Sequence, residues 1–212
     1  MISLAVIAIF ERRYHDLIFM KYVPNALTIA RIVVTPVMLI LLISNTFFGL
    51  VGALALLILG AISDYLDGKI ARSFKAGSRL GQFLDPLADK VLVLGTFVVL
   101  AILVPRVVPW WAIALIALRD VAVTVLRSWI ESRGRSLRTL PIAKAKTGVQ
   151  LGFLIALLGL MIGARLPGGT GRIFSAALHS EGPFIVLLFV VAFTLITGII
   201  YLVRQEYSSP VN

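Results

Sequence analysis

Long apolar runs separated by short polar segments dominate this chain, and most are long enough to form a helix across a membrane. A helix needs roughly 20 apolar residues to cross a bilayer. The pattern predicts six such spans, at about 25–44, 47–66, 83–104, 109–130, 142–163 and 183–203. We therefore expect an all-α integral membrane protein with six transmembrane helices.

The first residues of the chain are apolar but too short to form a further span. The run ends at Glu11 and has no basic segment before it, so a secretory signal is not expected. An interfacial helix is the favoured interpretation, and a start of translation at Met20 is the alternative. The resulting division is an amino-terminal interfacial segment (1–22), a six-helix transmembrane domain (23–205) and a short cytosolic tail (206–212).

The composition and charge agree with a membrane protein and orient it. The chain of 212 residues is 59% hydrophobic and has a net charge of +10. If the chain crosses the membrane at these six spans, all of its Lys and Arg except Arg106, Arg165 and Arg172 lie on or near the side of the membrane that holds the amino terminus. The positive-inside rule then places both termini in the cytosol. The basic charge is explained by cytosolic loops and membrane lipids, so no nucleic-acid partner is expected.

Acidic residues are concentrated in the stretch SDYLDGKIARSFKAGSRLGQFLDPLADK, residues 63–90. Asp64 and Asp67 are three residues apart, and Asp85 and Asp89 are four apart, so on helices each pair shares one face. Both pairs lie at the cytosolic ends of the second and third spans. A turn near 75–78 would therefore form a hairpin that brings four carboxylates together.

Four carboxylates at a membrane surface cannot all remain ionised without compensation. A hard divalent cation provides it, and ligands that are all oxygen favour Mg²⁺ or Mn²⁺. Two ions per site is the arrangement that handles phosphates. The alternative is that the aspartates merely end helices at water, paired with Lys69 and Arg72, but four at this spacing argue against it.

The order Asp64-x2-Asp67-Gly68-x2-Ala71-Arg72-x8-Gly81-x3-Asp85-x3-Asp89 resembles, without mismatch, the signature of the CDP-alcohol phosphotransferase family. The resemblance implies an integral membrane enzyme with six helices that forms homodimers. It implies that Asp64, Asp67 and Asp85 bind the metal, while Asp89 joins a second metal site and acts as the general base. The implied CDP-lipid-binding residues are Asn25, Thr28, Arg31, Gly68, Ala71, Arg72, Ser78 and Gly81.

A group of cations follows in the fourth and fifth spans, near their inner ends: Arg119, Arg127, Lys144 and Lys146. Few countercharges accompany them, chiefly Asp120 and Glu131. Cations beside a metal site favour an anionic second substrate, because Arg binds phosphate through two hydrogen bonds. An ordinary positive loop is the alternative, although it does not explain Arg119, which should lie within a span.

Three further segments, PNALTIARIVVTPV, ALRDVAVTVLRSWIESRG and IAKAKTGVQ, resemble the corresponding parts of bacterial phosphatidylglycerophosphate synthases. The resemblance implies transfer of a phosphatidyl group from CDP-diacylglycerol to sn-glycerol 3-phosphate. The charge distribution puts this reaction at the cytosolic face, and the lack of a transit-peptide pattern favours a bacterial plasma membrane. Inositol phosphate or phosphatidylglycerol, as in cardiolipin synthase, are alternative acceptors. A divalent-metal transporter is the alternative of another class, but its acids would be expected near the bilayer midplane.

Two features concern packing rather than chemistry. Gly148, Gly152, Gly159 and Gly163 fall nearly on one face of the fifth span, which predicts close packing within the bundle or a dimer, or else space for a ligand. The segment 166–174 is rich in glycine, and we expect a flexible connection on the outer side.

Overall fold

The apolar runs form helices, and their ends fall where proline, glycine or a capping residue interrupts them. The computed structural model describes residues 30–74, 79–132, 136–137, 141–203 and 207–208. Within these ranges, the side chains of 64–74, 79–89, 127–128, 131, 136–137, 141–144, 201–203 and 207–208 are outside the description. The expected interfacial helix at 1–22 and the turn at 75–78 lie outside it altogether.

Every predicted span corresponds to a helix. A helix over Ala30–Ile43 comes first and covers all but the first part of the predicted span 25–44. The other elements are α2 (Phe47–Phe74), α3 (Arg79–Leu103), α4 (Trp110–Ser132), α5 (Pro141–Gly163), α6 (Gly168–His179) and α7 (Gly182–Val203). Strand β1 (Ser136–Leu137) pairs antiparallel with β2 (Tyr207–Ser208), which joins the predicted tail to the α4–α5 connection. The prediction of an all-α fold is confirmed, apart from this two-residue pairing.

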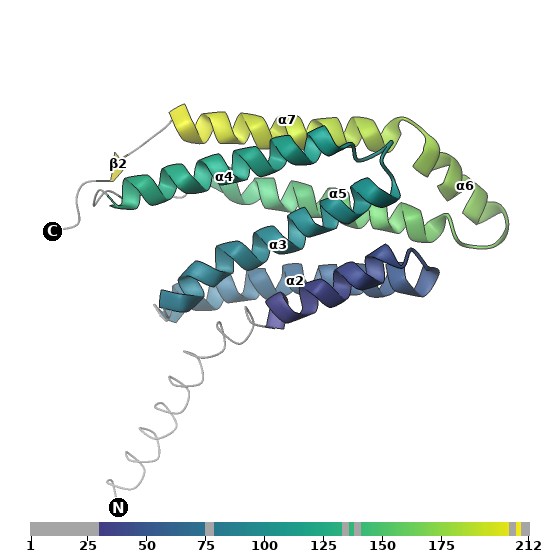
Figure 1. Ribbon diagram of the computed structural model, residues 1–212, viewed down its shortest axis with the longest axis horizontal. Helices are drawn as coiled ribbons and strands as arrows, with labels where there is room; N and C mark the ends of the chain where they lie inside the picture. Colours follow the sequence, from purple (N-terminus) through teal and green to yellow (C-terminus); the bar gives the residue numbers. More distant parts are fainter. Residues whose placement is uncertain (1–29, 75–78, 133–135, 138–140, 204–206, 209–212) are drawn as a thin grey trace, which may run out of the picture.

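The long helices lie side by side along the length of the molecule (Figure 1). Helix α5 contacts α2, α3, α6 and α7, while α4 packs against α3 and α7. The α3–α4 connection and the short helix α6 lie at one end, which we call the α6 end. The opposite end, where α2 ends and α3 begins, is called the motif end.

Apolar side chains fill the interior and also cover much of the outside. In the core, the ring of Phe97 stacks on that of Phe153 with a centroid distance of 6.0 Å. On the outside, Val33, Ile40 and Leu118 are 63%, 67% and 67% exposed. An apolar exterior of this kind suits lipid rather than water. Within the described residues, Ala145–Gly163 and Gly182–Ile200 are long and apolar enough to cross a membrane, by length and composition.

The turn into α2 shows how local residues stop one helix and start the next. Asn45 takes a left-handed conformation (φ 51°), which asparagine tolerates better than most residues. Thr46 then caps α2, because its Oγ1 accepts a hydrogen bond from the Gly49 N–H at 3.0 Å. Arg165 fastens this turn to the end of α5 by donating from Nη2 to the carbonyl oxygen of Asn45 at 2.9 Å and to its side-chain oxygen.

The expectation of a flexible connection at 166–174 is wrong. Helix α6 begins at Gly168 and packs against both α5 and α7. The ring of Phe174 lies so close to Gly163 that a Cβ there would be 2.5 Å from it, and Gly171 lies against the carbonyl oxygen of Leu166. The glycines that suggested a loop are therefore the residues that allow these close approaches.

The glycine face of α5 divides in two. Gly163 is a packing position, as predicted. A Cβ on Gly148, Gly152 or Gly159 would meet no described atom within 4 Å. These three glycines therefore make no tight contact with the described residues, and packing in a dimer or space for a ligand stays a prediction for them.

Candidate active site

The four motif aspartates lie on two helices, as the sequence predicts. Positions 64 and 67 belong to the last part of α2, and positions 85 and 89 to the first half of α3. Each pair therefore falls on one helical face. The side chains of Asp64, Asp67, Gly68, Ala71, Arg72, Gly81, Asp85 and Asp89 are outside the description, as are Asn25, Thr28 and Ser78 entirely.

Helices α2 and α3 pack together close to the motif. They are in contact, and a Cβ on Gly60 would be 3.1 Å from a methyl group of Leu92. Gly60 precedes Asp64 by about one helical turn, and Leu92 follows Asp89 by about one turn. The two halves of the motif therefore lie at similar levels of the bundle, on helices that touch.

The chemistry of this donor set fits a hard divalent cation. Asp64, Asp67, Asp85 and Asp89 offer only carboxylate oxygens, and such ligands suit Mg²⁺ or Mn²⁺. Among the described side chains, no group of three or more His, Cys, Asp or Glu could hold a metal. The side chains of the motif are outside the description, so metal binding by these four aspartates stays a prediction.

A buried ion-pair cluster lies between α4, α5 and α7. Lys146 Nζ donates to both carboxylate oxygens of Asp120, at 2.6 and 2.7 Å. Arg119 Nη1 donates to Asp120 Oδ1 at 3.2 Å. The side chains of Arg119 and Asp120 are only 10% and 8% exposed. Two cations share one carboxylate, so these three residues carry a net charge of +1 in the interior.

This cluster adds detail to the predicted cation group. Arg119 lies near the middle of α4 rather than at its end, which an ordinary positive loop does not explain. Lys146 is held by Asp120, a residue that we expected only as a nearby countercharge. Arg127 and Lys144 lie on α4 and α5, and their side chains are outside the description. Arg31, one of the residues implied to bind the CDP-lipid, is buried, at 4% exposed.

A hydrogen bond links the motif helix to the cation cluster. Lys90, which directly follows Asp89, donates from Nζ to Thr124 Oγ1 at 2.5 Å. Thr124 in turn donates to the backbone oxygen of Asp120 at 2.7 Å. The part of α3 that directly follows the motif therefore lies beside the part of α4 that carries Asp120.

Helix α7 contributes polar groups that we did not predict from the sequence. Arg119 Nη2 donates to Thr197 Oγ1 at 3.4 Å, and Gln150 Nε2 donates to Thr194 Oγ1 at 3.2 Å. Both threonines are buried. The available signal was their spacing, since two polar residues three apart in an otherwise apolar span mark an interior-facing side.

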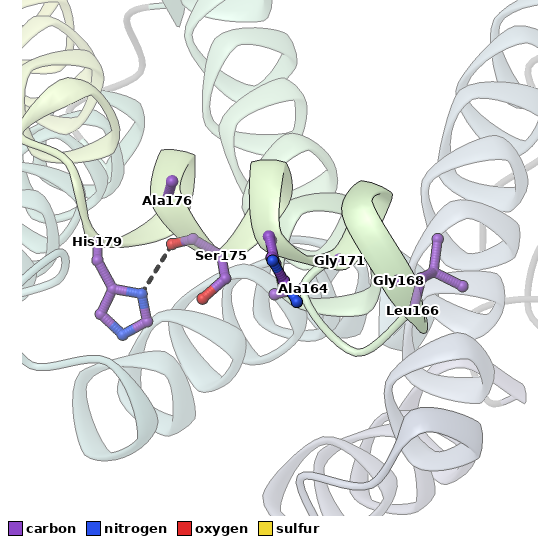
Figure 2. A pocket seen from close by; sticks show the side chains of 8 residues that line it. Ala164, Leu166, Gly168, Gly171, Ser175, Ala176 and His179 are labelled. Carbon is purple, nitrogen blue, oxygen red and sulfur yellow. Dashed lines mark hydrogen bonds between the residues drawn. The ribbon is translucent and has the colours of Figure 1, made fainter.

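An open pocket of about 570 Å³ lies at the α6 end, far from this cluster. Its wall is formed by α6 and the segment before it, including Leu166, Gly171 and Ser175 (Figure 2). His179 points along the same side, and its Nδ1 lies 2.8 Å from the Ser175 carbonyl oxygen. The lining of this pocket contains none of the residues that we predicted to bind substrate or metal.

Comparison with known proteins gives consistent results. A protein of Rickettsia typhi named CDP-diacylglycerol–glycerol-3-phosphate 3-phosphatidyltransferase is 37% identical over 184 residues, which cover 86% of this chain and 96% of the relative. An Arabidopsis thaliana protein, CDP-diacylglycerol–glycerol-3-phosphate 3-phosphatidyltransferase 2, is 31% identical over 170 residues, 73% of this chain and 72% of its own. A Mycobacterium bovis protein provisionally named a cardiolipin synthase is 30% identical over 141 residues, 66% of this chain and 65% of its own.

A family model covers most of the chain. The model described as CDP-alcohol phosphatidyltransferase matches residues 21–200, a range that includes both halves of the aspartate motif and the cation cluster. Members of this family are membrane proteins and use a divalent metal. The match and the relatives agree with the aspartate signature, and the chain belongs to the CDP-alcohol phosphatidyltransferase family.

Proposed function

We propose that this protein is an enzyme that transfers the phosphatidyl group of CDP-diacylglycerol to sn-glycerol 3-phosphate, giving phosphatidylglycerophosphate and CMP. The names of the Rickettsia and Arabidopsis relatives support this reaction. The observation that carries the choice of an anionic acceptor is the buried Arg119, which lies near the middle of α4 beside Asp120 and Lys146. A guanidinium binds a phosphate through two parallel hydrogen bonds, which favours an acceptor that carries a phosphate over a neutral alcohol.

The bonds change at the lipid-linked phosphorus. A hydroxyl oxygen of glycerol 3-phosphate forms a new bond to this atom, and the phosphorus–oxygen bond to CMP breaks, with CMP taking the electron pair. The hydroxyl proton passes to the carboxylate of Asp89, which we propose as the general base. A carboxylate is a weak base for an alcohol, so positioning of the two substrates supplies much of the rate.

The aspartates have a second role in holding metal. We propose that Asp64, Asp67 and Asp85 bind one Mg²⁺ or Mn²⁺ and that Asp89 joins a second ion. When bound, such ions neutralise the diphosphate and stabilise the leaving CMP. The family's use of a divalent metal and the all-oxygen donor set support this assignment.

The remaining predicted residues complete two binding regions. We propose that Gly68, Ala71 and Gly81 line the cytidine pocket, that Arg72 contacts the diphosphate, and that Asn25, Thr28, Arg31 and Ser78 contribute to the CDP-lipid site. For the acceptor phosphate we propose Arg119, Arg127, Lys144 and Lys146. Lys146 is bound to both oxygens of Asp120. We therefore propose that it acts on the phosphate mainly indirectly, by holding Asp120 in place.

The topology is proposed from the distribution of charge. Six spans over 23–205 place both termini in the cytosol, and the motif end then faces the cytosol, where a water-soluble acceptor is available. The exposed Trp110 and Trp111 at the start of α4 suit the opposite membrane interface. We further propose a bacterial plasma membrane and a homodimer, the latter from the family resemblance.

The provisional name of the mycobacterial relative favours a second candidate acceptor, phosphatidylglycerol. The test is CMP release by the purified protein with Mg²⁺ and CDP-diacylglycerol, measured for separate additions of glycerol 3-phosphate, phosphatidylglycerol and inositol phosphate. We expect release with glycerol 3-phosphate. Release with either other acceptor alone would contradict the assignment. A divalent-metal transporter is not supported, because the chain belongs to a transferase family.

A further inference from the structure

The side chain of Arg119 crosses from α4 to α7 and lies in a hollow above Gly198. A Cβ added to Gly198 would be 2.9 Å from both Cγ and Nε of Arg119. Real Cβ atoms essentially never approach another heavy atom that closely. Gly198 is itself buried within an apolar span. Glycine at this position therefore lets the aliphatic stem of Arg119 lie directly on the backbone of α7.

The guanidinium group at the end of that stem is held from two sides. Asp120 accepts from Nη1 at 3.2 Å and is itself fixed by the ion pair with Lys146. Thr197 accepts from Nη2 at 3.4 Å. The Thr197 hydroxyl donates its own proton to the carbonyl oxygen of Thr194 at 2.9 Å, so it is oriented to accept from Arg119. Three helices, α4, α5 and α7, thus determine one side-chain position.

Such restraint matters for a group that binds phosphate. A guanidinium binds a phosphate best through two parallel hydrogen bonds, which requires a defined plane. Arginine otherwise has several rotatable bonds, and ordering them on binding lowers affinity. Among the described residues, the buried Nε of Arg119 has no hydrogen-bond partner. The described neighbours therefore do not satisfy every hydrogen-bond donor of this side chain.

We propose that Gly198 and Thr197 of α7, together with Asp120, position Arg119 for the phosphate of the acceptor. Gly198 and Thr197 are positioning residues, since they act through Arg119 and need not touch the substrate. This inference rests on the proposed function, and it adds a requirement that neither the aspartate motif nor the cation group contains. The predicted consequence is selective for the acceptor, because the CDP-lipid is bound at the motif.

The test is Gly198→Ala, with Gly159→Ala as the matched control. Both change one glycine within an apolar helix to alanine, but a Cβ at Gly159 meets no described atom within 4 Å. In steady-state assays of CMP release, Gly198→Ala should raise the KM for glycerol 3-phosphate about tenfold, which corresponds to about 1.4 kcal/mol. The KM for CDP-diacylglycerol should change less than about threefold, on the same scale. Gly159→Ala should leave both constants unchanged.

Thr197→Val provides a second variant, because it removes the hydrogen-bond acceptor without adding bulk. It should raise the same KM by about threefold, as expected for one modest hydrogen bond. If Gly198→Ala prevents folding, this variant still tests the proposal. A Thr197→Val protein with an unchanged KM for glycerol 3-phosphate, or with equal increases for both substrates, would overturn it.

A double-mutant cycle with Arg119→Ala separates this inference from the proposed function. If Gly198 acts through Arg119, Gly198→Ala should have no further effect on the acceptor KM once Arg119 is alanine. Additive effects would overturn the positioning role while leaving the acceptor site intact. If Arg119→Ala alone does not raise the acceptor KM, the acceptor site proposed at Arg119 fails, and the positioning role fails with it.

Discussion

Two arginines, Arg119 and Arg165, each connect segments far apart in the sequence, one in the interior of the bundle and the other at the α6 end. Arg119 joins α4 to Thr197 and shares Asp120 with Lys146. Arg165 donates to the carbonyl oxygen of Met161 at 2.7 Å and to Asn45, which precedes α2. Both ties cross between helices, but their acceptors differ.

The different hydrogen-bond acceptors indicate a structural role for Arg165 and a functional role for Arg119. Arg165 bonds neutral oxygens at an end of the bundle, where water is close and its charge is readily solvated. Arg119 lies in the interior, where its guanidinium donates to Asp120 and Thr197. A guanidinium held in one plane is suited to bind a phosphate through two parallel hydrogen bonds. The first arrangement therefore stabilises a turn, whereas the second is suited to receive an anionic substrate.

The largest expected effect is at Asp89, in the aspartate motif. Asp89→Asn should lower kcat by a factor of about 10² to 10⁴, as is typical when a general base is removed. Binding of CDP-diacylglycerol should be largely retained, because the amide keeps the shape of the carboxylate. Single-turnover CMP release and equilibrium binding of the CDP-lipid measure the two quantities separately. Normal turnover would remove Asp89 from the base role.

Asp120→Ala should give the next largest effect, on stability. It leaves Arg119 and Lys146 in the interior without their carboxylate, and breaking a buried ion pair this way costs about 3–5 kcal/mol. Thermal unfolding in detergent measures the loss. The control is Glu181→Ala, which removes an exposed carboxylate near the α6 end and should change stability little. Equal losses of stability in the two variants would show that the buried ion-pair cluster stabilises the fold no more than an exposed carboxylate does.

Arg119→Ala and Arg165→Ala test the comparison directly. Arg119→Ala should raise the KM for glycerol 3-phosphate about 10- to 100-fold, since a hydrogen bond to a charged group contributes about 1.5–3 kcal/mol. Lys144→Ala should act in the same direction. Arg165→Ala should leave this KM unchanged. An equal increase in the KM for CDP-diacylglycerol in the Arg119 or Lys144 variant would indicate a structural role instead.

The smallest effect is expected on the stability of the α6 end. Arg165→Ala removes hydrogen bonds to Met161 and Asn45 and should lower the free energy of unfolding by about 1–2 kcal/mol. The exposed Arg172 on α6 offers a control of the same residue type, and Arg172→Ala should have almost no effect. Unfolding of the two variants under the same detergent conditions compares them. A larger loss for Arg172 would contradict the structural assignment of Arg165.

The sequence by itself determined the helices and the location of the chemistry, because both depend on local patterns. An apolar run of about 20 residues predicts a span wherever it packs, and α2, α3, α4, α5 and α7 lie close to the predicted ranges. The spacing of Asp64, Asp67, Asp85 and Asp89 places each pair on one helical face without any knowledge of neighbours. The prediction at α6 was wrong for a related reason, because glycines judged from the local sequence alone suggested a loop.

Only the tertiary structure decided which partners the polar residues have. Lys146 is 26 residues from Asp120, and Thr197 is 78 residues from Arg119. Whether such pairs meet depends on which helices are neighbours and on how each is rotated about its axis, and no local pattern contains that information. The hollow at Gly198 and the close contact of Phe174 with Gly163 have the same origin. They exist because two helices approach closely, which is a property of the packed bundle and not of either helix alone.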